Sequence, residues 1–463
     1  MRPRSVAVIG ASADKRKVGY SMQANARTSL GDRCYLVNPA YKEIEGLPCY
    51  PSVEDLPVVV DLVIVFVRAP LVPEVLSACG RKGIKRVMIQ SAGFAETGEQ
   101  GRALQDQCLA IAKEHGVRVW GPNCMGVVNG QAKMALSFMR PDLWQKNLRP
   151  GGVSLIVQSG MLSAGFLMQI LSENYFGVNL ACSIGNRSDV NECDLLEYMA
   201  DDPFTEVVAM YLESIADVDR FRNAVKKLNR PVLLVKGGTS AQGAKAALSH
   251  TASMAGNARI SEGLFRQLHI LRAADFVELM DLTKAHVLWR KKAAGKRVAV
   301  ATFSGAAGIV ATDHVMAKEM TLAELSPQTV QQLKTIYPDW MEPGNPLDLW
   351  PAIEQNGVTR VYSTVSDALL NDPGVDAIHF HIFVDGSLLK RDLDFLHILG
   401  KAPKPVAFWM IGDTTYFRAF RDKVESLGIP VFTEIERGIR CLKSMYELGQ
   451  DNSFRVAVGT SVT

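Results

Sequence analysis

Ser5-Val6-Ala7-Val8-Ile9-Gly10-Ala11-Ser12 is an apolar run that ends in a glycine turn, and a helical pattern follows it. The same arrangement returns at 153–160 and again at 297–308. Continuous apolar runs of this length are typical of strands covered on both faces, as in a parallel sheet. In doubly wound α/β domains, a glycine turn joins such a strand to the next helix. The three occurrences therefore predict three doubly wound α/β units in tandem.

Further apolar strand patterns follow these runs, separated by segments long enough for helices. They lie at 34–37, 60–67, 87–89 and 117–120, and then at 179–183, 206–212 and 231–235. The stretch 130–150 is expected to connect two units, and the polar segment 291–296 is expected to be a linker. A chain of 463 residues is long enough for roughly three domains of about 150 residues. We therefore predict domains at 1–130, 131–290 and 291–463.

Composition and charge argue against several classes of protein. The 51 Lys and Arg residues nearly balance the 48 Asp and Glu residues, and no block of five or six like charges occurs, so a nucleic-acid partner is not expected. The eight cysteines stand singly without a CxxC pair, which favours reduced thiols and argues against a metal site. No segment has the pattern of a signal peptide or a membrane span. We expect a cytoplasmic protein without a membrane partner.

The first glycine turn could face phosphate groups, because a helix that starts there directs backbone amides toward the ligand. The dinucleotide fingerprint GxGxxG is not present, since Ser12 and Lys15 occupy the second and third glycine positions. The second strand pattern ends in Asn38-Pro39, where a dinucleotide site would carry a carboxylate. CoA has a ribose 3′-phosphate and would instead need cations. The cations available are Lys15, Arg16, Lys17 and Lys42, although each could equally belong to a solvated face. The pattern as a whole favours CoA.

One of the eight histidines stands apart. His250 lies in segment 247–256, which consists largely of small and polar residues and ends in glycine, so this segment could form a flexible loop that carries the histidine. Six others fall in patterns that fit packing or surface roles. His269, His286, His314 and His397 are in helical patterns, and His379 and His381 are in the strand pattern 377–384. A lone histidine in a loop is a weak candidate for a catalytic residue, so the residues expected around it decide whether a catalytic role is favoured.

Two further segments could serve a phosphoryl group on that imidazole, a covalent intermediate that needs preorganised donors. Ser159 precedes a helical pattern, so its hydroxyl and the amides of Gly160 and Met161 are expected to cradle phosphate. Glu213 ends a strand pattern, where a carboxylate could hold the other imidazole nitrogen. Both features also have ordinary explanations, a serine-capped helix and a strand-end glutamate.

Four segments of the first unit resemble the CoA-binding domain of NDP-forming acyl-CoA synthetases. This is the succinyl-CoA synthetase superfamily, and the α subunit of ADP-forming acetate–CoA ligase is the type that the chain resembles. The segments are Ser5–Ser12, Val37–Pro39, Ser91–Gly98 and Gly121–Gly126. The resemblance implies a Rossmann-like domain with CoA over the carboxyl ends of the strands. It implies CoA contacts at Gly10, Ser12, Lys17, Asn38, Pro39, Lys42, Pro70, Ser91, Ala92 and Asn123.

Three segments of the second unit are similar to the ligase domain of the same synthetases. They are Ser183–Val190, Asp194–Tyr198 and Ser249–Thr251. The resemblance implies that two flavodoxin-like ligase domains follow the Rossmann-like one. It implies that His250 is a phosphohistidine, that Glu213 stabilises it, and that Ser159, Gly160 and Met161 bind its phosphate. The family usually has glycine after Ser-His-Thr, whereas Ala252 follows here, and the loss of this glycine stiffens the loop.

Two segments of the third unit, Thr302–Ile309 and Gly344–Leu349, resemble the third domain of the family's α subunit. The usual first motif is richer in glycine, so the resemblance does not carry a phosphate contact to this turn. Trp350 could either shape an acyl pocket or pack, and the sequence leaves both open.

The family reaction converts a carboxylate, CoA and ATP reversibly into acyl-CoA, ADP and phosphate, through an acyl phosphate and phosphohistidine. The resemblance covers about 3–449 and includes no ATP-grasp segment. ATP or ADP with Mg²⁺ is therefore expected on an ATP-grasp β subunit, in a hetero-oligomer such as α2β2. The substrate is expected to be a small carboxylic acid or its acyl-CoA. Two alternatives stay open: a CoA-binding regulatory or carrier module without turnover, and an acyl or carbamoyl transferase on the same scaffold.

Overall fold

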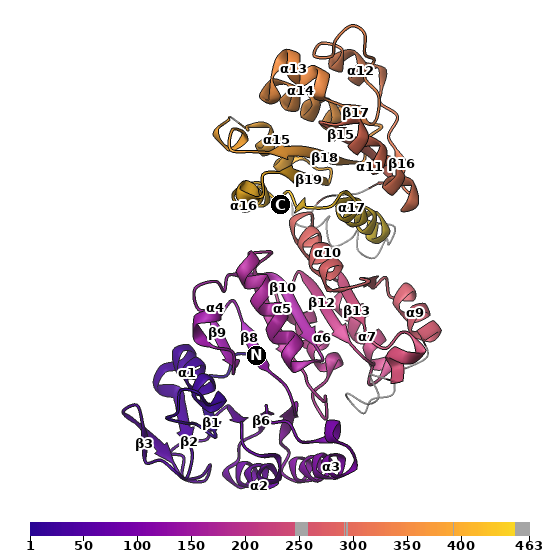
Figure 1. Ribbon diagram of the computed structural model, residues 1–463. Helices are drawn as coiled ribbons and strands as arrows, with labels where there is room; N and C mark the ends of the chain where they lie inside the picture. The colour runs from indigo at the N-terminus through magenta and orange to yellow at the C-terminus, as the bar shows by residue number, and fades with distance from the viewer. Residues whose placement is uncertain (246–257, 291, 293–294, 392, 450–463) are drawn as a thin grey trace, which may run out of the picture. The chain divides into compact units, whose positions relative to one another are not determined.

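The computed structural model describes residues 1–245, 258–290, 292, 295–391 and 393–449 (Figure 1). The chain divides into two compact units, Met1–Leu279 and Met280–Thr463. Among the residues described, the first unit holds two seven-stranded sheets and the second a six-stranded sheet. The strands are mainly parallel and alternate with helices along the chain. The predicted α/β fold class is confirmed.

The first sheet has the order β3-β4-β2-β1-β5-β6-β7, in which β3 runs antiparallel to β4 and the other pairs are parallel. Without β3 this is the Rossmann order, which reverses between β1 and β5 and so creates a ligand crevice at their carboxyl ends. Its strands are β1 Val6–Ile9, β2 Cys34–Val37, β3 Glu43–Ile44, β4 Leu47–Tyr50, β5 Leu62–Val65, β6 Arg86–Ile89 and β7 Arg118–Trp120. Its helices are α1 Val18–Leu30, α2 Val72–Lys82 and α3 Glu99–Glu114.

The second sheet has the order β14-β13-β12-β10-β11-β8-β9. Its five parallel strands follow the flavodoxin order, which reverses between β10 and β12. Its strands are β8 Gly126–Asn129, β9 Met134–Ser137, β10 Pro150–Val157, β11 Val178–Ser183, β12 Val207–Leu212, β13 Val232–Lys236 and β14 Leu271–Arg272. The helices along this part are α4 Pro141–Trp144, α5 Gly160–Glu173, α6 Glu192–Asp201, α7 Val218–Leu228, α9 Ala258–Gln267 and α10 Phe276–Leu288.

The third sheet has the order β16-β15-β18-β19-β20, and β17 pairs with β15. This is again a flavodoxin order, reversing between β15 and β18. Its strands are β15 Arg297–Thr302, β16 Thr321–Leu322, β17 Leu347–Asp348, β18 Ala377–Val384, β19 Val406–Gly412 and β20 Val431–Phe432. Its helices are α11 Gly305–Ala317, α12 Pro327–Leu333, α13 Trp350–Asn356, α14 Val358–Asn371, α15 Phe395–Lys401, α16 Phe417–Glu425 and α17 Ile435–Gly449.

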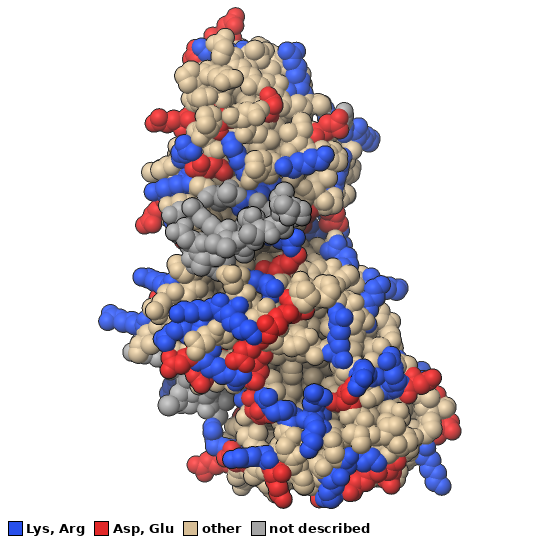
Figure 2. Space-filling view, turned by 180° about the vertical axis from the view of Figure 1, so that it is seen from behind, with Lys and Arg blue, Asp and Glu red and all other residues tan. Residues whose placement is uncertain are grey.

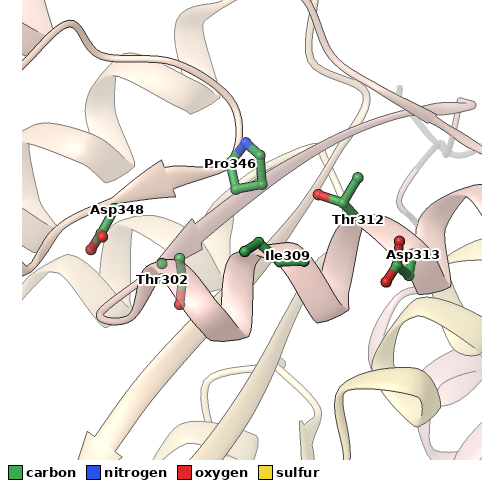
Figure 3. A pocket seen from close by; sticks show the side chains of 7 residues that line it. Thr302, Ile309, Thr312, Asp313, Pro346 and Asp348 are labelled. Carbon is green, nitrogen blue, oxygen red and sulfur yellow. The ribbon is translucent and has the colours of Figure 1, made fainter.

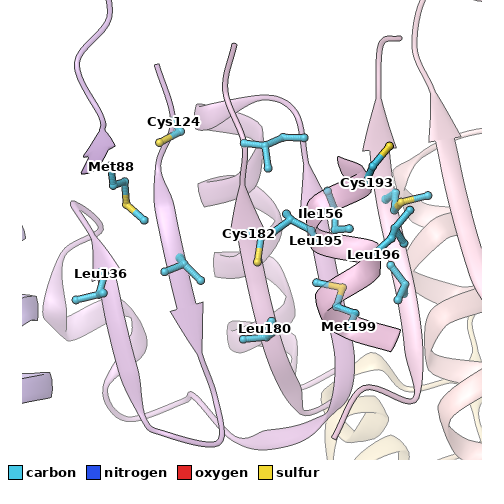
Figure 4. Packing of buried hydrophobic residues seen from close by; sticks show 14 of the residues in the cluster. Met88, Cys124, Leu136, Ile156, Leu180, Cys182, Cys193, Leu195, Leu196 and Met199 are labelled. Carbon is cyan, nitrogen blue, oxygen red and sulfur yellow. The ribbon is translucent and has the colours of Figure 1, made fainter. Parts of the chain in front are cut away.

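The two sheets of the first unit share one hydrophobic core. Val6 and Val8 of β1 belong to it, whereas Ala7 and Ile9 belong to a separate core with residues of α2 and α3. This division follows from the alternation of side chains along a strand. Figure 4 shows the shared core at the second sheet, where the sheet packs against α6. Burial on both faces is the reason that the strands read as continuous apolar runs.

The predicted connection at 130–150 is wrong in part, because it contains β9 and α4. β9 pairs antiparallel with β8, and β8 pairs antiparallel with β11, so a hairpin forms one edge of the second sheet. Two four-residue strands are too short for their pattern to be told from a loop. The helical prediction for His269 is also wrong, because this residue follows α9 with a φ of 51°, a conformation that ends helices. The three domain boundaries stay a proposal.

Side chains of both charge signs are interspersed over the face seen in Figure 2, in keeping with their near balance in the sequence. In the described part of the chain, no helix has the length and apolar character needed to cross a bilayer. Within the same residues, no group of three or more His, Cys, Asp or Glu side chains is placed to hold a metal ion.

Candidate functional site

The turn after β1 has no room for a side chain at two positions. Gly10 has a φ of 92°, and a Cβ there would collide with the carbonyl oxygen of Phe66, the residue after β5. Gly19, at the start of α1, lies so close to the turn that a Cβ there would collide with the Gly10 carbonyl oxygen. The helix start, the turn and the end of β5 therefore meet at the switch point, where backbone amides can approach a phosphate.

Ser12 and Asn38 hold this turn in place. The Ser12 N–H donates to Gln23 Oε1 (3.1 Å), and Gln23 Nε2 donates back to the Ser12 carbonyl oxygen (3.0 Å). Asn38 Nδ2 donates to the Ala11 carbonyl oxygen (2.7 Å), and Asn38 Oδ1 accepts from the Ala40 N–H (2.9 Å). An amide thus occupies the end of β2, where a dinucleotide site needs a carboxylate.

The other predicted CoA contacts lie on loops at the ends of neighbouring strands. Ser91, beyond β6, accepts from the Val67 N–H through Oγ (3.1 Å) and from the Asn123 N–H through its carbonyl oxygen (2.9 Å). These bonds tie the loops after β5, β6 and β7 to one another. Pro39 and Ala92 are exposed on such loops, and Pro70 is exposed in the short 3-10 helix Ala69–Leu71.

All four predicted cations are exposed, and one of them, Arg16, also forms an ion pair. Arg16 donates to Asp14 through Nε (3.1 Å) and Nη2 (3.0 Å), and this bond lowers the pKa of the Asp14 carboxyl. Arg16 is 90% exposed at its side chain, so this surface pair leaves its role as a candidate cation a prediction. Lys15, Lys17 and Lys42 are exposed. Exposed lysines near a β2 end that carries an amide and no carboxylate suit the 3′-phosphate of CoA, so the residues present fit this cofactor. The individual contacts stay a proposal.

A second candidate site lies at the switch point of the second sheet. α5 begins at Gly160, and its N-cap Ser159 is extended (φ −95°, ψ 133°) without a capping hydrogen bond from its side chain. The first-turn N–H groups of a helix have no acceptor within it. Met161 is 75% exposed, so the helix start is open. The serine-capped turn considered from the sequence is not what forms, and an anion could satisfy these donors instead.

Glu213 directly follows β12 and is 5% exposed. Its N–H donates to Oε1 of Gln158 (2.7 Å), the residue between β10 and Ser159. Gly237, after β13, makes room for the Tyr211 side chain, because a Cβ there would be 2.9 Å from the Tyr211 hydroxyl oxygen, and this hydroxyl donates to Glu213 Oε1 (3.4 Å). Burial, and next the charge of Glu213, raise the pKa of the Tyr211 hydroxyl to about 12. The structure thus places Ser159 and Glu213 at adjacent strand ends, and their roles stay a proposal.

Lys236 was not among the residues predicted from the sequence. It ends β13, is 8% exposed, and donates from Nζ to the carbonyl oxygens of Glu213 (2.5 Å) and Gly237 (2.5 Å). Burial lowers the pKa of Lys236, as do Arg272 and Arg187, against the opposing charge of Glu213. The signal that could have found it is a lysine at the end of an apolar strand pattern, directly before two glycines.

Arg187 also escaped prediction as a site residue. Its side chain is 6% exposed and bonds to the fully buried Glu192 (Nη1 to Oε2, 2.8 Å). The guanidinium also donates to the carbonyl oxygen (2.9 Å) and hydroxyl (2.6 Å) of Ser214, the residue after Glu213. The other carboxylate oxygen of Glu192 accepts from the Ala216 N–H (2.8 Å). This buried pair therefore fixes the loop that carries Glu213.

His250 lies outside the described residues, so its approach to Glu213 and to the start of α5 stays a prediction. The strand β13 ends at Lys236, beside Glu213, and His250 follows 14 positions later in the sequence.

The third glycine turn has a pocket of about 230 Å³ beside α11 (Figure 3). It is lined by Thr302, Gly305, Ile309, Thr312, Asp313, Pro346 and Asp348. The two carboxylates would repel an anionic substrate. Trp350 does not line this pocket; it is 51% exposed, and its backbone N–H donates to Asp348 Oδ1 (3.2 Å). The pocket thus gives no support to an acyl-binding role for Trp350.

His379 and His381 are buried in β18, as the predicted packing role requires. His381 Nδ1 lies 2.9 Å from Thr302 Oγ1, and its Nε2 lies 2.9 Å from His379 Nδ1. Burial lowers the pKa of His379 to about 3 and the pKa of His381 well below its usual value. Both imidazoles are therefore neutral near pH 7.

Two family models match the chain. The CoA binding domain matches residues 4–130, and the succinyl-CoA ligase like flavodoxin domain matches residues 150–286. These ranges contain the first and second candidate sites respectively.

Similar proteins cover nearly the whole chain. It is 33% identical to the alpha subunit of ADP-forming acetate–CoA ligase I from Pyrococcus furiosus, over 96% of each chain. It is 34% identical to ADP-forming acetate–CoA ligase II from Archaeoglobus fulgidus, but spans only 65% of that longer relative. Among solved structures, it is similar to acetyl-coenzyme A synthetase 1 of Ca. Korarchaeum cryptofilum, with a TM-score of 0.86 and 28% identity. The match covers 100% of this chain and 98% of that chain. These relatives are named ADP-forming acetate–CoA ligases or an acetyl-coenzyme A synthetase, and ligases of this kind are acid–thiol ligases, which confirms the predicted class. The chain therefore belongs to the ADP-forming acetate–CoA ligase family.

Proposed function

We propose that this chain is the α subunit of an ADP-forming acyl-CoA synthetase and that His250 carries the phosphoryl group. In the proposed reaction, phosphate attacks the thioester carbonyl of acyl-CoA, which releases CoA and leaves an acyl phosphate. His250 then takes the phosphoryl group and releases the carboxylate. ADP finally takes the phosphoryl group from the imidazole to form ATP. Each step is reversible, so the same route can make acyl-CoA from a carboxylate, CoA and ATP.

The observation that carries this proposal is the meeting of an open helix start and a buried carboxylate at one switch point. Gly160 and Met161 begin α5, and Glu213 lies at the adjacent strand end, anchored through Gln158 (2.7 Å). The helix start offers N–H donors and a positive dipole end to phosphoryl oxygens. A buried carboxylate favours a protonated imidazole nitrogen on the side away from the phosphoryl group. We assign phosphate binding to Ser159, Gly160 and Met161, and the carboxylate role to Glu213.

The CoA site is assigned to the first sheet. The proposal is supported by the close turn at Gly10, the amide of Asn38 at the end of β2, and the exposed lysines. When bound, CoA supplies the thiol that accepts the acyl group. The proposed contacts are Gly10, Ser12, Lys17, Asn38, Pro39, Lys42, Pro70, Ser91, Ala92 and Asn123.

The nucleotide step is assigned to a second polypeptide. Two Pyrococcus furiosus relatives are named alpha subunits, and the chain spans 65% of the longer Archaeoglobus fulgidus relative. The similar Ca. Korarchaeum cryptofilum protein has also been solved in complex with phosphate and ADP. We propose an ATP-grasp β subunit that binds ATP or ADP with Mg²⁺, in a hetero-oligomer such as α2β2. The purified chain alone should then show no turnover with acetate, CoA and ATP, and a rate within the usual enzyme range of about 1–1000 s⁻¹ would refute the subunit assignment.

The proposed substrate is a small carboxylic acid or its acyl-CoA, and the proposed location is the cytoplasm, where the eight free cysteines would stay reduced. A CoA carrier module or an acyl or carbamoyl transferase would not need His250. The names of the relatives favour neither alternative.

Labelling tests the proposed function directly. The chain is incubated with acetyl-CoA and radioactive phosphate, and acid-labile, base-stable label is expected on His250. His250→Ala should abolish it, whereas His269→Ala, a control at an exposed histidine, should keep it. Label that persists in His250→Ala would show that another residue is phosphorylated. The absence of label from wild-type protein that binds CoA would favour the carrier alternative and refute the proposal.

A further inference from the structure

One loop of the first unit connects the two candidate sites. The loop 184–188 runs between β11 and α6, and its backbone is held by the loop after β7: the Asn186 N–H donates to the Pro122 carbonyl oxygen (2.9 Å), and the Ser188 N–H donates to the Gly121 carbonyl oxygen (3.0 Å). The side chain of Asn186 contacts the proposed CoA site, and the side chain of Arg187 contacts the residue next to Glu213. We refer to it as the strut loop.

Asn186 connects the strut loop to the CoA side. Its Nδ2 donates to Oε2 of Glu96 (2.5 Å), which lies between β6 and α3, and to Oε1 of Gln105 (3.1 Å) in α3. Its Oδ1 accepts from Nδ2 of Asn123 (3.3 Å), one of the proposed CoA contacts. One amide group is thus bonded to the loops after β6 and β7 together.

Glu96 shapes the loop that follows Ser91 and Ala92. Its Oε1 accepts from the N–H groups of Gly93 (2.6 Å) and Phe94 (3.1 Å), while its Oε2 accepts from Asn186. Burial acts to raise the pKa of Glu96, but the hydrogen bonds from Asn186 and the two amides outweigh it and lower the pKa. The carboxylate is therefore charged at neutral pH and accepts on both oxygens.

Arg187 connects the strut loop to the phosphoryl side. Its guanidinium donates to the carbonyl oxygen and hydroxyl of Ser214, which adjoins Glu213 in sequence. The φ of Arg187 is 55°, in the left-handed region that costs energy for a residue other than glycine. The backbone bonds of Asn186 and Ser188 and the buried pair with Glu192 hold this conformation. Neighbouring residues of one loop are thereby bonded to both sites.

We propose that Glu96 and Asn186 are positioning residues, which hold the CoA loops at a set distance from Glu213 through the strut loop. The inference rests on the proposed function, because the distance matters only if a group passes from CoA chemistry to the imidazole. A misplacement of about 1 Å can slow such a step roughly 100-fold. Neither residue needs to touch the substrate for this effect.

Exchanging the donor and the acceptor between Glu96 and Asn186 tests the hydrogen bond that joins them. Glu96→Gln keeps one oxygen for the amides of Gly93 and Phe94 but turns an NH₂ group toward the NH₂ group of Asn186. Asn186→Asp instead places two carboxylates face to face. In the double variant, the new glutamine can donate to the new aspartate, Asn123 can keep donating to it through Nδ2, and Gln105 can turn its own NH₂ group toward it.

Each single variant should slow the labelling of His250 from acetyl-CoA and radioactive phosphate by about 10- to 100-fold. CoA affinity by calorimetry should change far less, and the double variant should recover most of the rate. Glu74→Gln is the matched control: its carboxylate is on α2, with its side chain 78% exposed, and the variant should label at the wild-type rate.

The outcomes separate this inference from the proposed function. If wild-type protein takes no label, the proposed function fails and the positioning role fails with it. If wild-type protein is labelled and both single variants match it, the positioning role alone is refuted. Slow single variants that the double variant does not rescue would show a general structural effect and would also refute it. Recovery in the double variant supports the contact even where a single variant is poorly folded.

Discussion

Replacing Glu192 with alanine should strongly destabilise the first unit. Glu192 is fully buried and Arg187 is 6% exposed at its side chain, and their charged groups lie 2.8 Å apart. The same carboxylate accepts from the Ala216 N–H (2.8 Å), so the substitution leaves a buried cation without a counter-ion and a buried amide without an acceptor. Removing one partner of a buried pair costs about 3–5 kcal/mol.

Thermal unfolding gives the measurement. A loss of 1 kcal/mol lowers the Tm of a domain of roughly 150–250 residues by about 2–4 °C. The Tm of the first unit should therefore fall by roughly 6–20 °C. The control is Asp219→Asn, which removes the ion-pair partner of Arg222. The Asp219 side chain is 84% exposed, so this loss should cost no more than about 1 kcal/mol.

A double variant separates stability from positioning. Arg187→Met with Glu192→Leu removes both charges, and replacing a buried pair with apolar side chains is often close to neutral for stability. This double variant should therefore recover most of the Tm that Glu192→Ala loses. Labelling of His250 should stay slow, because Ser214 has lost the guanidinium that holds it. A Tm loss in Glu192→Ala no larger than that in Asp219→Asn would refute the reasoning about the buried pair.

Three further predictions concern the core and the two sites. The eight buried cysteines of the native protein should not react with a thiol reagent at pH 8. Burial raises the pKa of Cys34 and Cys79 to about 12 and so disfavours the reactive thiolate. All eight should react in denaturant, and rapid reaction before unfolding would contradict the packing. The whole chain should bind CoA more tightly than NAD in calorimetry, since the end of β2 presents an amide and no carboxylate, and the reverse order would show that the first turn was misassigned. Glu213→Gln should reduce labelling of His250 and leave CoA affinity unchanged, whereas undiminished labelling would remove the role assigned to this carboxylate.

The sequence by itself determined the class of fold and the family. The apolar runs at 6–9, 153–157 and 297–302 each become the central parallel strand at which the strand order reverses. Such runs can be recognised because side-chain period and turn chemistry act over a few residues. The motifs that carry the family resemblance are short segments for the same reason. Where a segment is too short to show a period, as in β8 and β9, the prediction failed.

Only the tertiary structure decided which of these residues meet. Gln158 and Glu213 are 55 positions apart, and Glu96 and Asn186 are 90 positions apart, yet each pair is hydrogen-bonded. Lys236 and Arg187 look like ordinary surface cations in the sequence and are found buried only once neighbouring strands and loops cover them. Crossover connections set the order of the strands, and that order sets which strand ends are adjacent. Local sequence can therefore mark candidate residues, but long-range packing decides which of them touch.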